Sequence, residues 1–168
     1  VSFLSGFRGI LQTDGYTGYN AAAKTVTVHA GCWAHLRRYF IDAVKVNRLD
    51  TVAVDFVKRM DEVFAVDRKA AEAKMPFAER RALRQEKSAS IVAGIHERLL
   101  AVKGTVLPKS KLGEAVDYAL GQWPRMVVFL EHGEIELSNN LAENSMRPVA
   151  VGRNYAQLPI MRSVVGRL

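Results

Sequence analysis

The sequence predicts an α/β protein with a small core of strands and a helix and a large all-helical insertion. Two short strand patterns, at residues 9–14 and 24–30, lie near the N-terminus. A helical spacing of apolar residues begins at Trp33 and returns from residue 51 almost to residue 135. This order places core elements in residues 1–50, a helical insertion in 51–135 and a final segment in 136–168.

The first predicted strand is the apolar run at residues 9–14, which ends in Asp14 and Gly15. An Asp-Gly pair favours a turn, so a carboxylate stands at the C-terminal end of this strand. The second strand pattern, residues 24–30, alternates apolar and polar residues as a half-buried strand does.

An amphipathic helix is predicted from Trp33, because apolar residues recur there every three or four positions as far as Val44. The opposite face of this helix should be polar and exposed. It carries His35, Arg38, Asp42 and Lys45.

The helical insertion begins with residues 51–103, and its pattern is interrupted near Pro76. Past that break four basic residues cluster, and a solvated face is favoured over a DNA-binding face for them. These are Arg80, Arg81, Arg84 and Lys87. A further helix follows Pro108, and Trp123-Pro124 should start a separate short helix that ends near Gly133.

The composition points to a basic protein that would attract polyanions. The chain of 168 residues has a formal net charge of +7, and nucleic acid is the commonest partner of such a surface. A single cysteine, Cys32, excludes an internal disulfide and fits a reducing cytosol. No apolar run is long enough to cross a bilayer. The opening from Val1 into Phe3 resembles the middle of a domain, which suggests a fragment.

A second carboxylate, Glu143, lies in a short polar stretch near the C-terminus. Asn140, Glu143, Asn144 and Arg147 have the spacing that places residues on one face of a helix. This stretch can also be a capping box, with Asn140 as the N-cap, and Asp14 can be an ordinary turn residue. Two such carboxylates together suit divalent-metal phosphoryl transfer, for which Mg²⁺ needs only a few protein ligands.

Three motifs carry a resemblance to a known family. They are Leu-Gln-Thr-Asp-Gly-Tyr-Thr-Gly-Tyr-Asn at 11–20, Gly-Cys-Trp-Ala-His-Leu-Arg-Arg-Tyr-Phe at 31–40, and Ser-Asn-Asn-Leu-Ala-Glu-Asn-Ser-Met-Arg-Pro at 138–148. Together they resemble the transposases of insertion sequence 66, and the match continues through Gly-Arg-Asn-Tyr at 152–155. The resemblance implies a ribonuclease-H-like fold, here a partial core, and an Asp-Asp-Glu (DDE) triad that binds Mg²⁺ or Mn²⁺. Asp14 matches the second aspartate and Glu143 the glutamate, so both are expected to be catalytic and to bind the metal.

The sequence departs from the family pattern at both ends. The first aspartate of the family lies upstream of the region that matches Val1, and no Asp or Glu precedes Asp14 here. After Gly152-Arg153 the chain also diverges from the usual family pattern. We therefore expect an incomplete triad, as in a truncated or frameshifted copy of the element.

Basic residues near both carboxylates are the expected DNA contacts. Arg147 and Arg153 are the first candidates, followed by Arg37, Arg38 and Lys24, and the resemblance also places His35 near DNA. Cys32 and His35 have a spacing seen at zinc sites, but structural zinc usually takes two or more cysteines and four ligands.

The sequence thus predicts a DDE transposase of a mobile element, acting in DNA transposition by phosphodiester hydrolysis and strand transfer. Its partners would be transposon ends and target DNA, with a homo-oligomer assembled on the DNA. It would lie in the bacterial cytoplasm, associated with the nucleoid. Two alternatives stay open: a non-catalytic DNA-binding remnant, and a structure-selective nuclease of the same fold.

Overall fold

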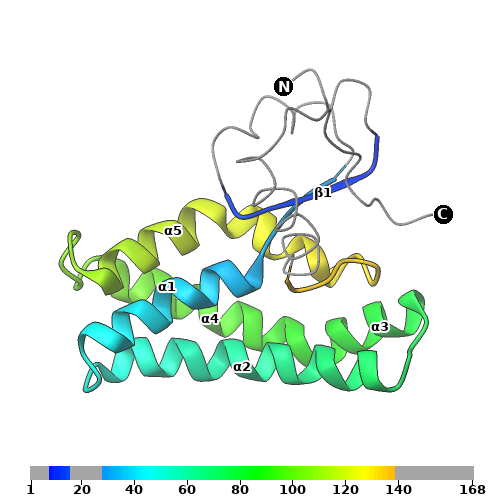
Figure 1. Ribbon diagram of the computed structural model, residues 1–168, viewed down its shortest axis with the longest axis horizontal. Coiled ribbons are helices and arrows are strands. Elements are labelled where there is room, and N and C mark those ends of the chain that lie inside the picture. Colours follow the sequence, from blue (N-terminus) through cyan, green and yellow to red (C-terminus); the bar gives the residue numbers. More distant parts are fainter. Residues whose placement is uncertain (1–7, 16–27, 139–168) are drawn as a thin grey trace, which may run out of the picture.

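The structure is a computed structural model that describes residues 8–15 and 28–138 (Figure 1). Its described part is mostly helical, with two short parallel strands. The elements are β1 (Ile10–Thr13), β2 (Val28–Gly31), α1 (Trp33–Val46), α2 (Thr51–Glu72), α3 (Phe77–Leu83), a π-helical turn (Arg84–Ser88), α4 (Ala89–Lys103), α5 (Lys111–Met126) and a 3₁₀ turn (Val128–Leu130).

Strands β1 and β2 pair in parallel, with Ile10 opposite Val28 and Thr13 opposite Gly31. Parallel pairing places the carboxyl ends of both strands at the same edge of the sheet. Asp14 therefore follows β1 at the edge where β2 ends and leads into α1. Both predicted strands are confirmed where the structure describes them, and residues 24–27 of the second lie outside the described residues.

Helix α1 forms as predicted, and its apolar stripe is buried through Trp33, Leu36, Phe40 and Ala43. The expected exposure of His35 is wrong, because this residue is only 9% exposed. Its ring Nδ1 lies 3.2 Å from the sulfur of Cys32, which is itself fully buried. The side chain of His35 thus faces the interior, like the neighbouring side chains at the start of the helix.

The helices form a four-helix body in which α1 packs against α2 and α5, and α4 packs against the same two helices. Figure 1 shows the strand pair on one side of this body, and β2 contacts α5 and the 3₁₀ turn. Residues 51–133 contain no strand, as the sequence predicts. One continuous apolar core runs from Ala30 through all four helices to Leu137. The predicted boundary near residue 50 lies in a turn between helices that share this core.

The prediction of a separate helix starting at Trp123-Pro124 is wrong. Helix α5 runs through Pro124 and ends at Met126. A proline inside a helix lacks a backbone donor and crowds the preceding turn, which usually ends the helix. Pro124 lies in the last turn of α5, so few helical bonds are affected. Trp123 and Met126 are both buried here. Only a short 3₁₀ turn follows.

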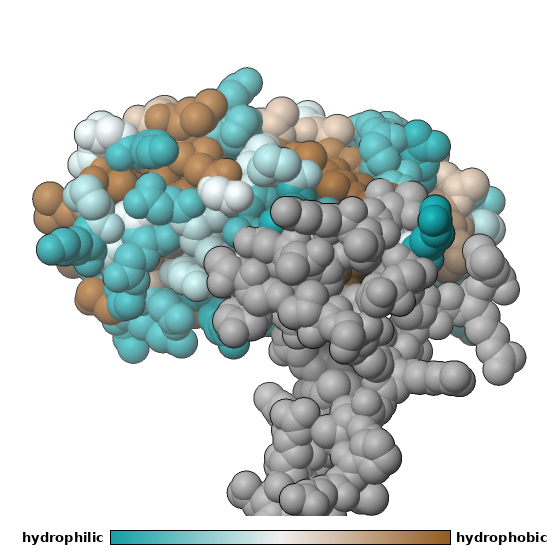
Figure 2. Space-filling model, turned by 90° about the horizontal axis from the view of Figure 1, so that it is seen from above, coloured by the Kyte–Doolittle hydropathy of each residue, from teal (hydrophilic) through white to brown (hydrophobic). Residues whose placement is uncertain are grey.

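The exposed surface is mixed in character. On the face shown in Figure 2, hydrophilic and hydrophobic residues alternate over the described part. At the end of the body where α1 leads into α2, Val46, Leu49 and Leu107 are 73%, 88% and 76% exposed. No helix in the described ranges is long and apolar enough to span a membrane.

Two glycine substitutions test this packing, because one glycine sits against backbone and the other faces open space. A Cβ on Gly133 would lie 1.9 Å from the carbonyl oxygen of Phe77, whereas a Cβ on Gly121 meets nothing within 4 Å. Gly133→Ala should lower the free energy of unfolding by about 1–3 kcal/mol. Gly121→Ala in α5 should raise it by about 0.5–1 kcal/mol through helix propensity. Urea denaturation of both variants checks this. An unchanged free energy of unfolding in Gly133→Ala would contradict the described turn.

Candidate functional site at the end of strand β1

The turn after β1 is held by helix α5. The hydroxyl of Tyr118 donates to the backbone carbonyl of Asp14 at 2.5 Å. Gly15 has a φ of 87°, and a Cβ there would lie 3.0 Å from both Tyr118 and Gln122. The position therefore requires glycine for its backbone angle and for room. Asp14 is fixed at the edge of the sheet by a helix more than a hundred residues away in sequence.

Two further contacts surround this turn. The Tyr118 ring stacks on Tyr39 of α1, with centroids 4.2 Å apart, and burial raises the pKa of Tyr118, so its hydroxyl stays a donor. On β1 the Thr13 hydroxyl lies 2.8 Å from Nε2 of His29 in β2. Burial, aided by the charge of Arg125, lowers the pKa of His29. The neutral imidazole is therefore the favoured form beside Thr13.

On the other side β1 is tied to the segment that follows the last described helix. The Gln12 side-chain amide donates to the carbonyl of Gly31 at 3.2 Å and to that of Glu136 at 2.6 Å. The carbonyl of Leu137 in turn accepts from the amides of Trp33 and Ala34 at 2.9 and 3.4 Å. The first two amides of α1 are thus satisfied by this segment and not by a side-chain cap.

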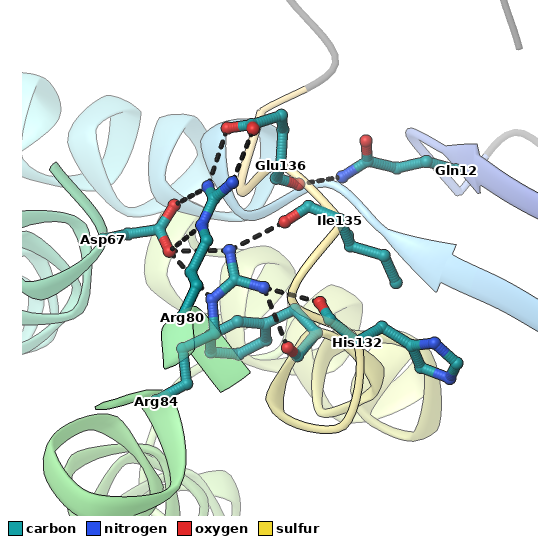
Figure 3. Close-up of polar contacts among 8 residues, drawn as sticks. Gln12, Asp67, Arg80, Arg84, His132, Ile135 and Glu136 are labelled. Carbon is teal, nitrogen blue, oxygen red and sulfur yellow. Dashed lines mark hydrogen bonds and ion pairs between the residues drawn. The ribbon is translucent and has the colours of Figure 1, made fainter. Parts of the chain in front are cut away.

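We call residues 132–137 the anchored segment, because buried Arg84 binds two of its carbonyls and buried Arg80 binds the carboxylate of Glu136 (Figure 3). Arg84 donates to the carbonyl oxygens of His132 and Ile135, each at 2.7 Å, and to that of Phe129 at 3.0 Å. Its remaining donors go to Asp67, from Nε at 2.8 Å and Nη2 at 2.6 Å. An arginine has five N–H donors, and all five are used here. The guanidinium also lies over the ring of Phe129.

Arg80 completes the network by joining Asp67 to Glu136. It contacts Asp67 at 2.6 and 3.2 Å and Glu136 at 2.7 and 2.9 Å. Arg80 is 5% exposed and Arg84 is 1% exposed, so the predicted solvated face is wrong for both. Charged residues are buried when they are paired and hydrogen-bonded, and here two guanidiniums face two carboxylates. Arg81 and Lys87 are exposed as predicted.

Helix α2 carries a sequence signal for this network that the clustering of basic residues alone does not show. Asp67 continues the buried stripe of α2, which runs through Phe56, Met60 and Val63 to Asp67 and Ala70. A carboxylate in an apolar stripe indicates a buried ion pair. On the facing helix the buried positions Arg80, Arg84, Ser88 and Val92 are each four residues apart.

The π-helical turn at Arg84–Ser88 fits that spacing. In a regular α-helix residues four apart advance by about 40° beyond a full turn, so the stripe would rotate away from α2. A π turn accommodates an extra residue and keeps the side chains in line. Helix α3, the π turn and α4 therefore continue one another while Arg80 and Arg84 both reach Asp67.

Of the predicted DNA-contacting residues, the structure describes three, all in helix α1. Arg38 is exposed on α1, whereas Arg37 forms a two-bonded ion pair with Asp61 of α2 at 2.6 and 3.1 Å. His35 is buried beside Cys32. Lys24, Arg147 and Arg153 lie outside the described residues, and so does the proposed ligand Glu143.

The described ranges alone do not contain a complete metal site. Within residues 8–15 and 28–138, no group of three His, Cys, Asp or Glu side chains could hold a metal ion. Asp14 is the one carboxylate of the predicted pair that is described, at the edge where parallel strands end. The described residues therefore include one of the two carboxylates that are expected to bind the metal.

Comparison with known proteins identifies the family. The model of the family described as "Transposase IS66 family" matches residues 1–159. The chain therefore belongs to the insertion sequence 66 family of transposases, as the sequence motifs predict.

Three relatives from Sinorhizobium fredii (strain NBRC 101917 / NGR234) illustrate the similarity. "Uncharacterized protein y4qI" is 38% identical over 159 residues, y4jD is 36% identical over 162 and y4hP is 35% identical over 166. Each alignment covers 89% of this chain but only 29% or 30% of the relative. The chain thus spans less than a third of the length of these relatives. No solved structure matches it.

Removal of the central carboxylate tests the arginine network. Asp67→Asn would leave two buried guanidiniums without their shared anion, and breaking a buried pair typically costs about 3–5 kcal/mol. Asp61→Asn on the same helix breaks an exposed pair, which is worth about 0–1 kcal/mol. Denaturant unfolding of both variants checks the difference, and equal losses would contradict the burial of the network.

The His29 environment predicts a pH dependence of stability. Its folded-state pKa lies below the ordinary 6.5, so the unfolded chain binds more protons. The free energy of unfolding should be highest above pH 6.5, fall as the pH drops through 6.5, and level off below the folded-state pKa. In His29→Gln this part of the dependence should be absent. Unfolding of both proteins measured between about pH 5 and pH 8 tests this, and identical pH dependences would contradict it.

Proposed function

We propose that this chain contributes Asp14 and Glu143 to the catalytic carboxylates of a DDE transposase that moves DNA. The supporting observation is the fixed position of Asp14. It lies at the carboxyl edge of a parallel strand pair, in a turn held by Tyr118 and a required glycine. Membership of a transposase family over residues 1–159 supports a role of this chain in transposition.

The proposed fold is a partial ribonuclease-H-like core that carries a helical insertion. Its support is the parallel pairing of β1 with β2, followed by α1, and the absence of strands from residues 51–133. The insertion shares its apolar core with α1 and β2. In this arrangement the helical body serves as the rigid support of the strand edge.

The proposed cofactor is Mg²⁺ or Mn²⁺, with Asp14 and Glu143 as ligands. A bound divalent ion would neutralise charge on the scissile phosphate and on the leaving oxygen. The reaction class is hydrolysis of a phosphodiester at a transposon end, followed by attack of the freed 3′-hydroxyl on target DNA. The contribution of the chain is to hold both carboxylates in place, because few-ligand Mg²⁺ sites depend on well-placed acids.

DNA binding is proposed to follow from surface charge. The chain carries a net charge of +7, and the network of Arg80, Arg84, Asp67 and Glu136 has no net charge of its own. The excess positive charge thus belongs to other residues. Arg38 is exposed on α1, the helix whose Tyr39 stacks on Tyr118 beside the Asp14 turn. A homo-oligomer assembled on the DNA is proposed for the complete protein.

The purified chain should bind DNA without sequence selectivity but should not cut it. Binding follows from its charge, and the affinity should fall steeply as salt rises because counterions are released. Cutting is not expected of these residues by themselves, because the proposed mechanism needs a third carboxylate besides Asp14 and Glu143. The measurement is retention and nicking of labelled transposon-end and random DNA, in Mg²⁺ and in Mn²⁺.

Two variants serve as controls. Glu143→Gln removes a proposed metal ligand and tests cutting, and Arg38→Ala removes an exposed positive charge and tests binding. Metal-dependent nicking that disappears in Glu143→Gln would show that the chain is active without the first aspartate. Failure to retain DNA even at low salt would contradict the binding proposal. Strand-transfer assays on the complete protein distinguish a transposase from a structure-selective nuclease, which cuts without joining.

A further inference from the structure

We propose that two loops at one end of the helical body form a surface that binds the phosphate backbone of double-stranded DNA. The loops are residues 45–50, where α1 leads into α2, and residues 103–111, where α4 leads into α5 (Figure 1). Together we call them the basic end. The inference rests on the DNA binding of the proposed function and assigns that binding to a place on the molecule.

The basic end has an excess of one sign of charge. Five of its six charged residues are basic, and they supply more than half of the net charge of +7. Its one acid, Asp50, caps α2, and its carboxylate accepts from the amides of Val52 and Ala53 at 3.0 Å. That carboxylate is directed at backbone donors and leaves the cations in excess. The five basic residues are Lys45, Arg48, Lys103, Lys109 and Lys111.

Three of these cations are available to an anion from outside. Lys45 and Lys111 each pair with an acid three residues away on the same helix. Arg48, Lys103 and Lys109 are exposed, and they form no ion pair with any residue in the described ranges. A solvated face usually carries both signs of charge, so this excess of cations indicates a polyanionic partner.

The two loops share one groove, which also carries apolar side chains. It is lined by Val46 and Asn47 from the first loop and by Leu107 and Ser110 from the second. Val46, Leu49 and Leu107 are strongly exposed among the cations. A DNA backbone presents phosphates to the cations and deoxyribose carbons to the apolar groups, so both kinds of side chain gain a partner. A second copy of this chain fits less well, because it carries the same net charge of +7.

The basic end lies on the same face of α5 as the residue that holds the Asp14 turn. Lys111 and Tyr118 are seven residues apart on α5, which places them on one face and about 10 Å apart along the axis. Lys111 also interacts electrostatically with Tyr39, whose ring stacks on Tyr118. A duplex bound at the basic end can therefore extend along α5 toward the strand edge.

A matched pair of triple variants tests this assignment. The basic-end variant removes the three unpaired cations by Arg48→Gln, Lys103→Gln and Lys109→Gln. The control variant removes three exposed cations where α2 leads into α3, by Arg68→Gln, Lys69→Gln and Lys74→Gln. Both variants lose three positive charges, and most of the length of α2, about 30 Å, separates the two sites (Figure 1). All six side chains are exposed, so urea unfolding should be little changed in either variant.

The measurement is the affinity of the purified chain for a short labelled duplex of random sequence, followed by fluorescence anisotropy as salt rises. Each phosphate contact contributes about 0.9 to the slope of log affinity against log salt, so the slope should fall by about 2–3 in the basic-end variant. In the control variant it should fall by less than about 1. Leu107→Ser should weaken binding and leave the slope unchanged, because it removes an uncharged contact. If the triple variant fails to fold, Lys109→Gln alone should lower the slope by about 1.

The outcomes separate this surface from the proposed function. Equal changes of slope in the basic-end and control variants would overturn the assignment and leave DNA binding by the chain intact. No binding by the wild type even at low salt would reject both. Self-association that is lost only in the basic-end variant, measured by sedimentation velocity, together with an unchanged slope, would show that a second copy covers the groove and would also overturn the assignment.

Discussion

The described structure depends on one buried carboxylate. Asp67 lies between Arg80 and Arg84, and each guanidinium extends to the anchored segment from there. Helix α2 thereby positions Arg80 of α3 and Arg84 of the π-helical turn, and these two side chains determine the path of the chain after the 3₁₀ turn. Apolar packing brings these helices together, but packing is tolerant of small shifts. The directional bonds of paired arginines select one register among the positions that packing allows.

The edge of the sheet is held from two directions. Helix α5 fixes the Asp14 turn through Tyr118, and Gln12 links the same strand to the anchored segment. Neither contact involves the carboxylate group of Asp14, so the residue's place is determined by its backbone and by its neighbours. The surrounding hydrogen bonds thereby preserve the location of Asp14 at the strand edge, which the proposed metal-binding role would require.

Local patterns were sufficient to predict the strands, helix α1 and the acid that follows β1, but not the continuation of α5 through Pro124. The period of the apolar residues reports which face is buried, and this holds for Leu36, Phe40 and Val63. The pattern failed for His35, because its place on the polar side of α1 does not show that Cys32 and the neighbouring elements cover it. It also failed for Arg80 and Arg84, since the burial of a charge depends on a partner elsewhere in the chain. Gln12 and Tyr118 could not be predicted at all, because their partners lie 124 and 104 residues away in sequence.

The neutrality of the arginine network separates two kinds of electrostatics in this protein. Mobile ions screen charges that face water, but they act far less on pairs buried in the interior. Contacts between DNA phosphates and exposed residues such as Arg38 would therefore weaken as salt rises, while the bonds of Arg84 to Asp67 and to the anchored segment would persist. If the chain binds DNA as proposed, its release by rising salt leaves the strand edge assembled.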